Sequence, residues 1–507
     1  MNMSLNTAVD DKVGVDNWYH ELCRLNEVQP VTQVRVVEVN SIDENPAAFN
    51  ERLTAALQVL LEMVSSEDAP LLNKMDRAYL DQLIVQVDQR LSDQLDAILH
   101  QPEFKALEST WLSLQHLVDR VDFRSNVLLH MLDVDKETLS DDFDDALDIR
   151  ESGLYKHIYD QAYDMPGGKP VSAMISGFDF TPQLPDVQLL NHIGQVSASA
   201  HCPFIASASA QFFGKDSMES VTQISHLMEH FERPEYLHWN HFRASDNARY
   251  IGLTLPNFLL RLPYGQQHPT KGFFYHEQVV GADHQKYTWG SASYAFAANL
   301  AQAFQKHGWL VNIRGPESGG RVDGLVLHQY DIGQGVELKI PTEVMISETR
   351  ELALSDLGFI PMCYYKDSPY ACFFSANSCH LPAKYDTKEA TANSKINARL
   401  PYIFLSSRLG HYLKVLQRES IGGAKSRVTL ETELNQWLGN LVTQMPNPGP
   451  SLLAERPLKE GRVTVLENPE DPGFFKVNLH IVPHFQIEGI DVKLSLVSQM
   501  PNQKSTV

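Results

Sequence analysis

The sequence predicts a multidomain protein of mixed α/β class, with either α/β or α+β organisation, and three observations support this prediction. From about residue 150 to 395, strand-like runs alternate with amphipathic helices. The chain has 507 residues, which is far more than one hydrophobic core needs. Near the C-terminus, apolar and polar residues alternate in two successive runs, a pattern typical of a β-hairpin.

The N-terminal residues indicate an arm that cannot fold alone. A short amphipathic helix is predicted at 17–28 from the helical spacing of Trp18, Leu22 and Leu25. The β-branched stretch 31–40, VTQVRVVEVN, is typical of a strand. One short helix and one strand bury too little apolar surface to form a core, so this arm is expected to need a partner.

Helices are predicted next, over 48–64, 74–100 and 103–121. One stripe of the third helix holds five apolar residues: Phe104, Leu107, Trp111, Leu114 and Val118. The acidic segment 133–148 is expected to be a solvated loop with a short helix. A calcium-binding loop is disfavoured there because its glycine is missing.

The body then combines strands and helices. Strands are predicted at 171–180, 203–209, 250–255 and 359–365, and helices at 184–201 and 290–308. The segment 444–457 is expected to be a Pro-rich linker. The closing hairpin is predicted from strands at 475–487 and 490–496, with Phe475, Val477, Leu479 and Ile481 on one face of the first strand. An isolated hairpin is marginally stable, and an open edge invites pairing with another chain.

Composition excludes several classes of function. The net charge of −21 disfavours nucleic-acid binding, because phosphate contacts need a basic face. Five cysteines without a C-x-x-C pair indicate reduced thiols in the cytosol. We found no signal-peptide pattern and no apolar run of membrane-spanning length, so a soluble cytoplasmic protein without direct membrane insertion is expected.

Motifs for catalysis, metals or cofactors are not evident. The stretch 165–172, MPGGKPVS, lacks the second glycine of a phosphate loop, and 315–320, GPESGG, lacks the strand–turn–helix context of a dinucleotide loop. We therefore predict no cofactor, no metal and no enzymatic activity. An unrecognised α/β enzyme using His201, Cys379 and His380 remains the less favoured alternative.

A cluster of basic residues stands out in this acidic chain. Within 400–442, the apolar residues Leu405, Leu409, Tyr412 and Leu416 are predicted to be buried on one helix face. The opposite face is expected to carry bases: Arg408, His411, Lys414, Arg418, Lys425 and Arg427. Such a surface suits an acidic partner, although a merely solvated face remains an alternative.

Several long segments resemble one known family, the large sheath subunit of type VI secretion systems (TssC, also called VipB). The segments that carry the resemblance are 104–127, 243–265, 339–361, 372–378, 400–422 and 481–501. They occur in order over about residues 75–501, including the stretch KIPTEVMISETRELALSDLGFIP at 339–361. The resemblance implies a phage-tail-sheath-like fold with an extended N-terminal arm and a C-terminal hairpin.

The resemblance also implies partners. The large subunit would pair with a small sheath subunit (TssB, also called VipA), and copies would assemble helically around a tube of Hcp protein. The sheath would be cytoplasmic, anchored through a baseplate to the cell envelope, and its contraction would drive the tube into a target cell. A ClpV-type AAA+ ATPase recycles such sheaths in the family. A non-contractile scaffold paralogue is the alternative within the same family.

Residue roles follow from the resemblance together with the local patterns. The arm strand (Val34, Val36, Val37, Val39) and the hairpin (Val477, Leu479, Ile481, Val492, Leu494, Leu496) would pair between protomers. The bases Lys414, Arg418, Lys425 and Arg427 would contact the inner tube. Trp18, Leu22 and Leu25 would form the ATPase-binding helix, which departs from the family's acidic-aliphatic pattern by having Trp18 and Tyr19.

Four regions are expected on this basis. They are an arm at 1–45, a helical segment at 46–125 that packs with the small subunit, an α/β body at 126–395, and a C-terminal domain at 396–507.

Overall fold

A computed structural model describes residues 77–484, apart from residues 272, 280, 282, 332–334, 422–425, 444, 446, 447 and 468–474. The chain divides into two compact units. Unit 1 comprises Met1–Glu108 and Arg261–Thr288, and unit 2 comprises Ser109–Leu260 and Trp289–Val507. The predicted helices 17–28 and 48–64 and the predicted strand 31–40 lie outside the described residues.

Two helices confirm the predictions made for residues 74–121. Helix α3 spans Arg77–Leu99, and α4 spans Pro102–Val118, with the division between the units falling inside α4. The apolar stripe of α4 is largely exposed to solvent: Phe104, Leu107, Trp111 and Val118 are all exposed, and Leu107 is 56% exposed. The buried residues of α4 are instead Ser113 and Leu117.

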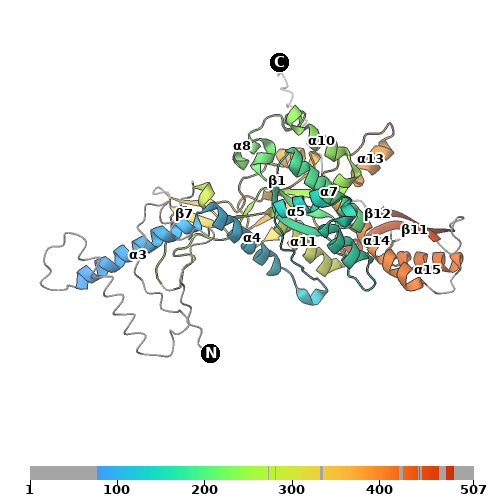
Figure 1. Ribbon diagram of the computed structural model, residues 1–507, viewed down its shortest axis with the longest axis horizontal. Coiled ribbons are helices and arrows are strands. Elements are labelled where there is room, and N and C mark those ends of the chain that lie inside the picture. The colour runs from blue at the N-terminus through green and yellow to red at the C-terminus, as the bar shows by residue number, and fades with distance from the viewer. Residues whose placement is uncertain are drawn as a thin grey trace, which may run out of the picture. The chain divides into compact units, whose positions relative to one another are not determined.

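A mixed six-stranded sheet forms the centre of unit 2 (Figure 1). Its strand order is β1 (Met174–Phe180), β2 (Phe204–Ala208), β3 (Ile251–Leu255), β9 (Phe359–Tyr364), β10 (Tyr370–Phe373) and β6 (Arg321–Asp323). The first four strands are parallel, and β10 pairs antiparallel with both β9 and β6. The four parallel strands confirm the predicted strands of the body, whereas β10 and β6 were not predicted.

Helices cover both faces of this sheet. One face packs against α7 (Leu184–Ala200), α10 (Leu237–Ala244) and α12 (Glu348–Asp356), and the other against α11 (Ala292–His307) and the first half of α14 (Leu400–Ser420). Neighbouring strand residues therefore enter different cores: Phe204 packs in the first cluster and Ile205 in the second. This layering confirms the α/β prediction.

The remaining elements of unit 2 are short. They are η2 (Phe123–Ser125), α5 (Lys136–Asp145), η3 (Ile149–Glu151), α6 (Gly153–Tyr155), the π-helix η4 (Lys156–Asp164), η5 (Ala210–Phe213), α8 (Met218–Thr222), α9 (Leu227–His230), η6 (Pro234–Tyr236), η7 (Asp246–Tyr250) and α13 (Lys388–Ile396). Two small antiparallel sheets pair β4 (Phe258–Leu259) with β5 (Trp289–Gly290) and β7 (His328–Asp331) with β8 (Val336–Lys339). In unit 1, η8 spans His284–Lys286.

The C-terminal part of unit 2 has its own core. The second half of α14 packs with α15 (Arg427–Gly439) and a two-stranded sheet of β11 (Leu458–Glu467) and β12 (Phe475–Pro483). The prediction of a linker at 444–457 was wrong in part, because α16 (Pro450–Glu455) lies within it. Strand β11 was not predicted at all.

The hairpin prediction needs a related correction. Its first strand is β12, which ends at Pro483, but within the described part of the chain β12 pairs with β11. The predicted second strand, 490–496, lies outside the described residues. None of the described helices combines the length and apolarity that crossing a bilayer requires.

Candidate functional site

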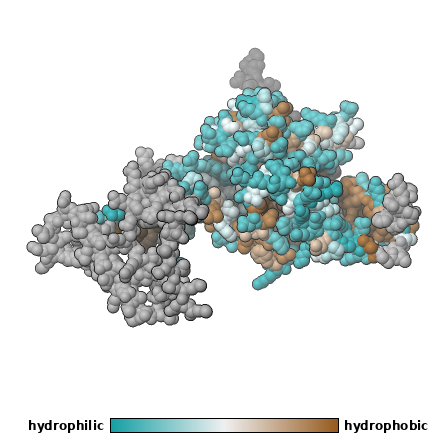
Figure 2. All heavy atoms as spheres, in the orientation of Figure 1, coloured by the Kyte–Doolittle hydropathy of each residue, from teal (hydrophilic) through white to brown (hydrophobic). Residues whose placement is uncertain are grey.

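The β11–β12 sheet is two-faced in the way that its alternating sequence predicts. On β12, Phe475, Val477, Leu479 and Ile481 pack against the C-terminal core, and on β11 the residues Val463 and Val465 are fully buried in it. The register pairs Val463 with Leu479 and Val465 with Val477. Figure 2 shows hydrophobic residues gathered where β11 and β12 lie.

The outer edge of β11 is closed by side chains of α15. Asn435 Nδ2 donates a hydrogen bond to the Val463 carbonyl at 2.8 Å, and the Val463 N–H donates to Asn435 Oδ1 at 2.9 Å. Glu431 Oε2 accepts from the Val465 N–H at 3.4 Å, and Arg427 Nη1 donates to the Val465 carbonyl at 3.4 Å. These side chains satisfy the backbone groups that a neighbouring strand would otherwise bind. We call this the closed edge.

The closed edge shows which backbone N–H and C=O groups of β12 point away from β11. In an antiparallel ladder, residues in non-hydrogen-bonded pairs point their backbone groups away from each other. Because the groups of Val463 and Val465 point toward α15, those of their partners Leu479 and Val477 point outward from β12. Within the described residues no strand pairs there. We call this side the open edge, and it permits strand addition.

The structure thus brings three of the predicted strand-pairing residues onto one strand, since Val477, Leu479 and Ile481 all lie on β12. The others lie outside the described residues: Val34, Val36, Val37, Val39, Val492, Leu494 and Leu496. The same is true of Trp18, Leu22 and Leu25, the predicted ATPase-binding residues. Sequence reasoning missed Asn435, because an Asn on a helix resembles an ordinary surface residue.

The predicted tube-contacting bases on α14 contact their own chain. Lys414 Nζ lies 2.7 Å from Asp164 Oδ1 and 3.8 Å from the centre of the Tyr163 ring. Arg418 donates hydrogen bonds to the carbonyls of Tyr163, Asp164 and Met165 at 3.0–3.2 Å. The hydrogen bond and charge of Lys414 lower the pKa of Asp164. Both bases therefore fix the C-terminal end of η4 to α14.

Two predictions for the basic helix were wrong. His411 was expected on the exposed basic face, but it is only 7% exposed and its Nε2 lies 2.9 Å from the Ala200 carbonyl. Burial lowers the pKa of His411 to about 4, so this ring is neutral near pH 7. Tyr412 was expected in the buried stripe but is 39% exposed, whereas Leu405 and Leu409 are buried as predicted.

The remaining two bases predicted to contact the tube are Arg427 and Lys425. Arg427 Nη1 lies 3.1 Å from Glu431 Oε2, so it belongs to the closed edge. Lys425 lies outside the described residues.

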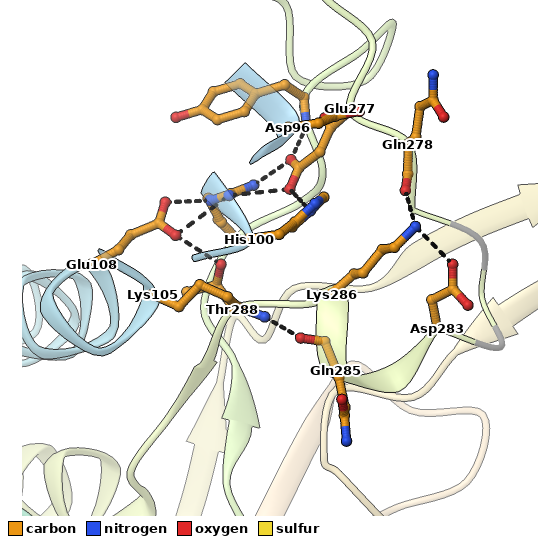
Figure 3. A network of polar contacts seen from close by, with 12 residues as sticks. Asp96, His100, Lys105, Glu108, Glu277, Gln278, Asp283, Gln285, Lys286 and Thr288 are labelled. Atoms are coloured by element: carbon orange, nitrogen blue, oxygen red, sulfur yellow. Dashed lines mark hydrogen bonds and ion pairs between the residues drawn. The ribbon is translucent and has the colours of Figure 1, made fainter. Parts of the chain in front are cut away.

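A buried ion-pair network organises unit 1 (Figure 3). The Arg261 guanidinium lies between two carboxylates, with Nε 2.6 Å from Glu108 Oε1 and Nη1 2.7 Å from Glu277 Oε2. Glu277, whose side chain is 1% exposed, also contacts His100 Nε2 at 3.2 Å and accepts from the Tyr264 N–H at 3.0 Å. Burial alone raises the pKa of Glu277, but the bonds from His100 and Arg261 lower it to about 2.

Cys379 and His380, which the alternative enzyme hypothesis invoked, are packed and hydrogen-bonded within the fold. Cys379 is fully buried, and burial raises its thiol pKa to about 12, which opposes nucleophilic reactivity. The Cys379 carbonyl accepts from Arg243 Nε at 3.1 Å, and His380 Nδ1 lies 3.0 Å from the Ser245 carbonyl. Among the described residues, no group of three or more His, Cys, Asp or Glu side chains could hold a metal ion.

Comparison with known families gives two matches that together cover most of the chain. The family described as EvpB/VC_A0108, tail sheath N-terminal domain (VipB), matches residues 81–380. The family described as EvpB/VC_A0108, tail sheath gpW/gp25-like domain, matches residues 389–500. The second match contains α14, α15 and the β11–β12 sheet.

Individual relatives were also found. The type VI secretion system sheath protein TssC1 of Pseudomonas aeruginosa is 35% identical over 461 residues, which cover 90% of this chain and 92% of that protein. A cryo-EM structure of the anti-feeding prophage baseplate matches 74% of this chain and 84% of that chain, with 11% identity and a TM-score of 0.37. The contracted helical sheath of the same prophage matches 64% and 69%, with 11% identity and a TM-score of 0.34.

Proposed function

Because the chain belongs to the VipB family of type VI secretion sheath proteins, we propose that it pairs with a TssB-type small subunit and that these protomers form a helical sheath around an Hcp tube. The family is structural, so the chain is a contractile sheath subunit and not an enzyme. Contraction of the sheath would propel the tube and its effectors into a target cell. The sheath would lie in the cytoplasm and be anchored through a baseplate to the cell envelope.

One observation carries the proposed mode of assembly: the terminal sheet is closed on the β11 side and open on the β12 side. A strand from a neighbouring protomer would add beyond β12, on the outer side of the predicted strand 490–496. The predicted arm strand, 31–40, is the donor. Its β-branched residues suit a pleated surface, and main-chain hydrogen bonds supply the affinity.

Donor and acceptor surfaces differ in this arrangement. A contact between two different surfaces repeats along an axis and produces rings or helices, whereas a contact between identical surfaces produces closed dimers. Pairing through arms would also keep protomers connected while their bodies move. Contraction itself is a rigid-body rearrangement between two packings and needs no catalytic residue.

The four expected regions correspond to parts of this mechanism. The arm at 1–45 donates a strand, the helical segment at 46–125 packs with the small subunit, the body at 126–395 forms the sheath wall, and 396–507 contains the acceptor sheet. In the first region, Trp18, Leu22 and Leu25 would bind a ClpV-type ATPase. A pulldown with the ATPase's N-terminal domain, using chains with and without residues 1–28, tests that role.

The main test is co-expression with the small subunit, followed by negative-stain microscopy. Removing residues 485–507 leaves β11 and β12 in place and should abolish tubes while the small subunit still co-purifies. Removing only 502–507, beyond the family-like segment, should leave tubes intact. Tubes that persist without residues 485–507 would contradict assembly through this sheet, and wild-type chain that forms neither tubes nor a complex would contradict the sheath proposal.

The inner-tube role of Lys414, Arg418, Lys425 and Arg427 is a separate proposal. Changing all four to Glu should weaken co-assembly with Hcp. Since Lys414 and Arg418 also hold η4, and Arg427 belongs to the closed edge, the unfolding midpoint of the protomer must be measured alongside. Lost co-assembly at an unchanged midpoint supports tube contact. Normal co-assembly contradicts it.

A further inference from the structure

Residues 127–134, VLLHMLDV, are an exposed apolar segment that belongs to no helix or strand. They connect η2 to α5. Four large apolar side chains face solvent within five positions: Leu128 is 55% exposed, Leu129 38%, Met131 68% and Leu132 50%. This density of exposed apolar residues is typical of a surface that another molecule covers. We call residues 127–134 the docking segment.

The backbone of the docking segment is also unpaired. Counting only partners that the structure describes, none of its N–H or C=O groups takes part in a hydrogen bond. Backbone groups that become buried need hydrogen-bond partners. A molecule that covers these side chains must therefore also bind the main chain or leave its groups unsatisfied.

Both ends of the docking segment are anchored near β1. Val127 packs against the cluster that Ile175 of β1 also contacts, and Val134 packs against the cluster that contains Phe180. Just after the segment, Lys136 Nζ donates to the Asp179 carbonyl at 2.9 Å and lies 2.7 Å from Asp186 Oδ1. The segment is thus held at its two ends, at the side of the sheet where β1 is the edge strand.

We propose that the docking segment binds a β-strand of the small sheath subunit, an inference that rests on the proposed function for the existence of that partner. A strand satisfies the main-chain groups and covers the alternating side chains together, whereas a helix offers free backbone groups only at its two ends. Leu128 and Leu132 would lie on one face of the pair, and Leu129 and Met131 on the other.

The charge pattern indicates the chemistry of the partner strand. Asp133 lies within the docking segment and Asp122 and Asp135 flank it, and all three are exposed. The nearby bases are Arg124 and Lys136, the latter paired with Asp186. A strand of aliphatic residues bordered by basic side chains complements the three carboxylates. The strands predicted at 31–40 and 490–496 are already assigned to other contacts between protomers, so the strand that covers the docking segment is expected to come from the small subunit.

Hydrogen exchange in the wild-type complex gives a direct test. The described chain provides no hydrogen bonds that would protect the amides of residues 128–133. In the complex of the full chain with a TssB-type small subunit, we expect these amides to exchange at least tenfold more slowly than in the chain alone. Equal, fast exchange in both samples would overturn the proposal.

A substitution pair tests the same contact independently. Met131→Pro removes one unpaired N–H and should reduce co-purification of the small subunit at least tenfold, whereas Met131→Val keeps the N–H and should co-purify normally. If Met131→Pro lowers the unfolding midpoint of the chain, Leu128→Ser/Leu132→Ser replaces it, with the same expected loss. Normal co-purification of these variants overturns the docking role.

Two further outcomes are decisive. If the variants keep the small subunit but lose self-association, a second copy occupies the segment and the proposal is wrong. If the wild-type chain binds the small subunit and forms tubes, and the variants do so equally well, the docking proposal is wrong while the proposed sheath function stands. The proposed function fails instead when the wild-type chain itself binds no small subunit.

Discussion

Asn435 on α15 holds the backbone of Val463 on β11 by two hydrogen bonds of 2.8 and 2.9 Å, so one amide side chain occupies the position of a neighbouring strand. Among the described residues, this contact leaves the terminal sheet with one unpaired edge, that of β12. It also closes the β11 edge to unwanted pairing with another chain.

Asn435→Ala should destabilise the C-terminal core by about 1–3 kcal/mol, because it leaves the Val463 N–H and C=O without partners. It should also increase aggregation by opening the β11 edge. Gln436→Ala, at the exposed neighbouring position, should change stability by less than about 0.5 kcal/mol. Urea unfolding and light scattering measure both effects. Equal behaviour of the two variants would show that the closed edge does not depend on Asn435.

Gly461→Ala should destabilise the same core by about 1–3 kcal/mol through overpacking. A Cβ at Gly461 would lie 2.8 Å from Leu438 Cδ2 and 2.9 Å from its Cγ, because α15 packs closely on β11 there. Gly439→Ala is the matched control, since its Cβ would meet no atom within 4 Å. Thermal unfolding should separate the two. An unchanged midpoint for Gly461→Ala would mean that Leu438 moves aside without cost.

Glu277 should make the stability of unit 1 depend on acid pH. Its pKa is about 2 in the folded state and 4.5 in the reference state, so its contribution is complete above pH 4.5 and is lost as pH falls toward 2. At pH 3 the loss should be about 2 kcal/mol. The destabilisation caused by Glu277→Gln should accordingly shrink between pH 7 and pH 3.

The control for this experiment is Asp283→Asn, at an ion pair with Lys286 whose side chains are each 42% exposed. It should cost less than about 1 kcal/mol. Denaturant unfolding followed at several pH values provides the comparison. A Glu277→Gln effect of the same size at pH 7 and pH 3 would contradict the ion-pair account.

His411 should cause a second loss of stability in milder acid. Its pKa is lowered from 6.5 to about 4 by burial, so the folded state disfavours protonation. The neutral ring contributes its full stabilisation above pH 6.5, and this stabilisation is lost as pH falls toward 4. At pH 5 the loss of folding free energy should be about 2 kcal/mol.

His411→Gln, whose amide can still donate to the Ala200 carbonyl, should flatten the stability profile between pH 7 and pH 5. His157→Gln, at an exposed position, should leave the profile unchanged. Thermal midpoints of the protomer across this pH range test the prediction. Parallel profiles for wild type and His411→Gln would exclude His411 as the titrating group.

The sequence predicts the long, apolar parts of this fold better than its short or charged parts. Strands β2, β3 and β9 are nearly continuous apolar runs, as expected for parallel strands buried on both faces, whereas β1, at the edge of the sheet, is only partly buried. Strand β11, LKEGRVTVLE, has a charged first half that hides its pairing role. The strands β4 and β5 have two residues each, which is too short for any periodic pattern.

The candidate site shows the same division. Alternation on β12 correctly identified Val477, Leu479 and Ile481 as one face. The burial of His411 could not be predicted, because its partner Ala200 is 211 positions away in the sequence. The closed edge could not be predicted from the sequence either, because it depends on how α15 packs against β11.

The closed edge also limits what happens when terminal sheets meet wrongly. A cross-β stack grows only if each chain pairs with one neighbour above and another below. In the part of the chain that the structure describes, the terminal sheet accepts a strand on one side only. If two such sheets pair through their open edges, both closed edges face outward and a third chain has no strand edge to bind. Incorrect pairing of this kind therefore stops at a dimer and does not extend into a fibril.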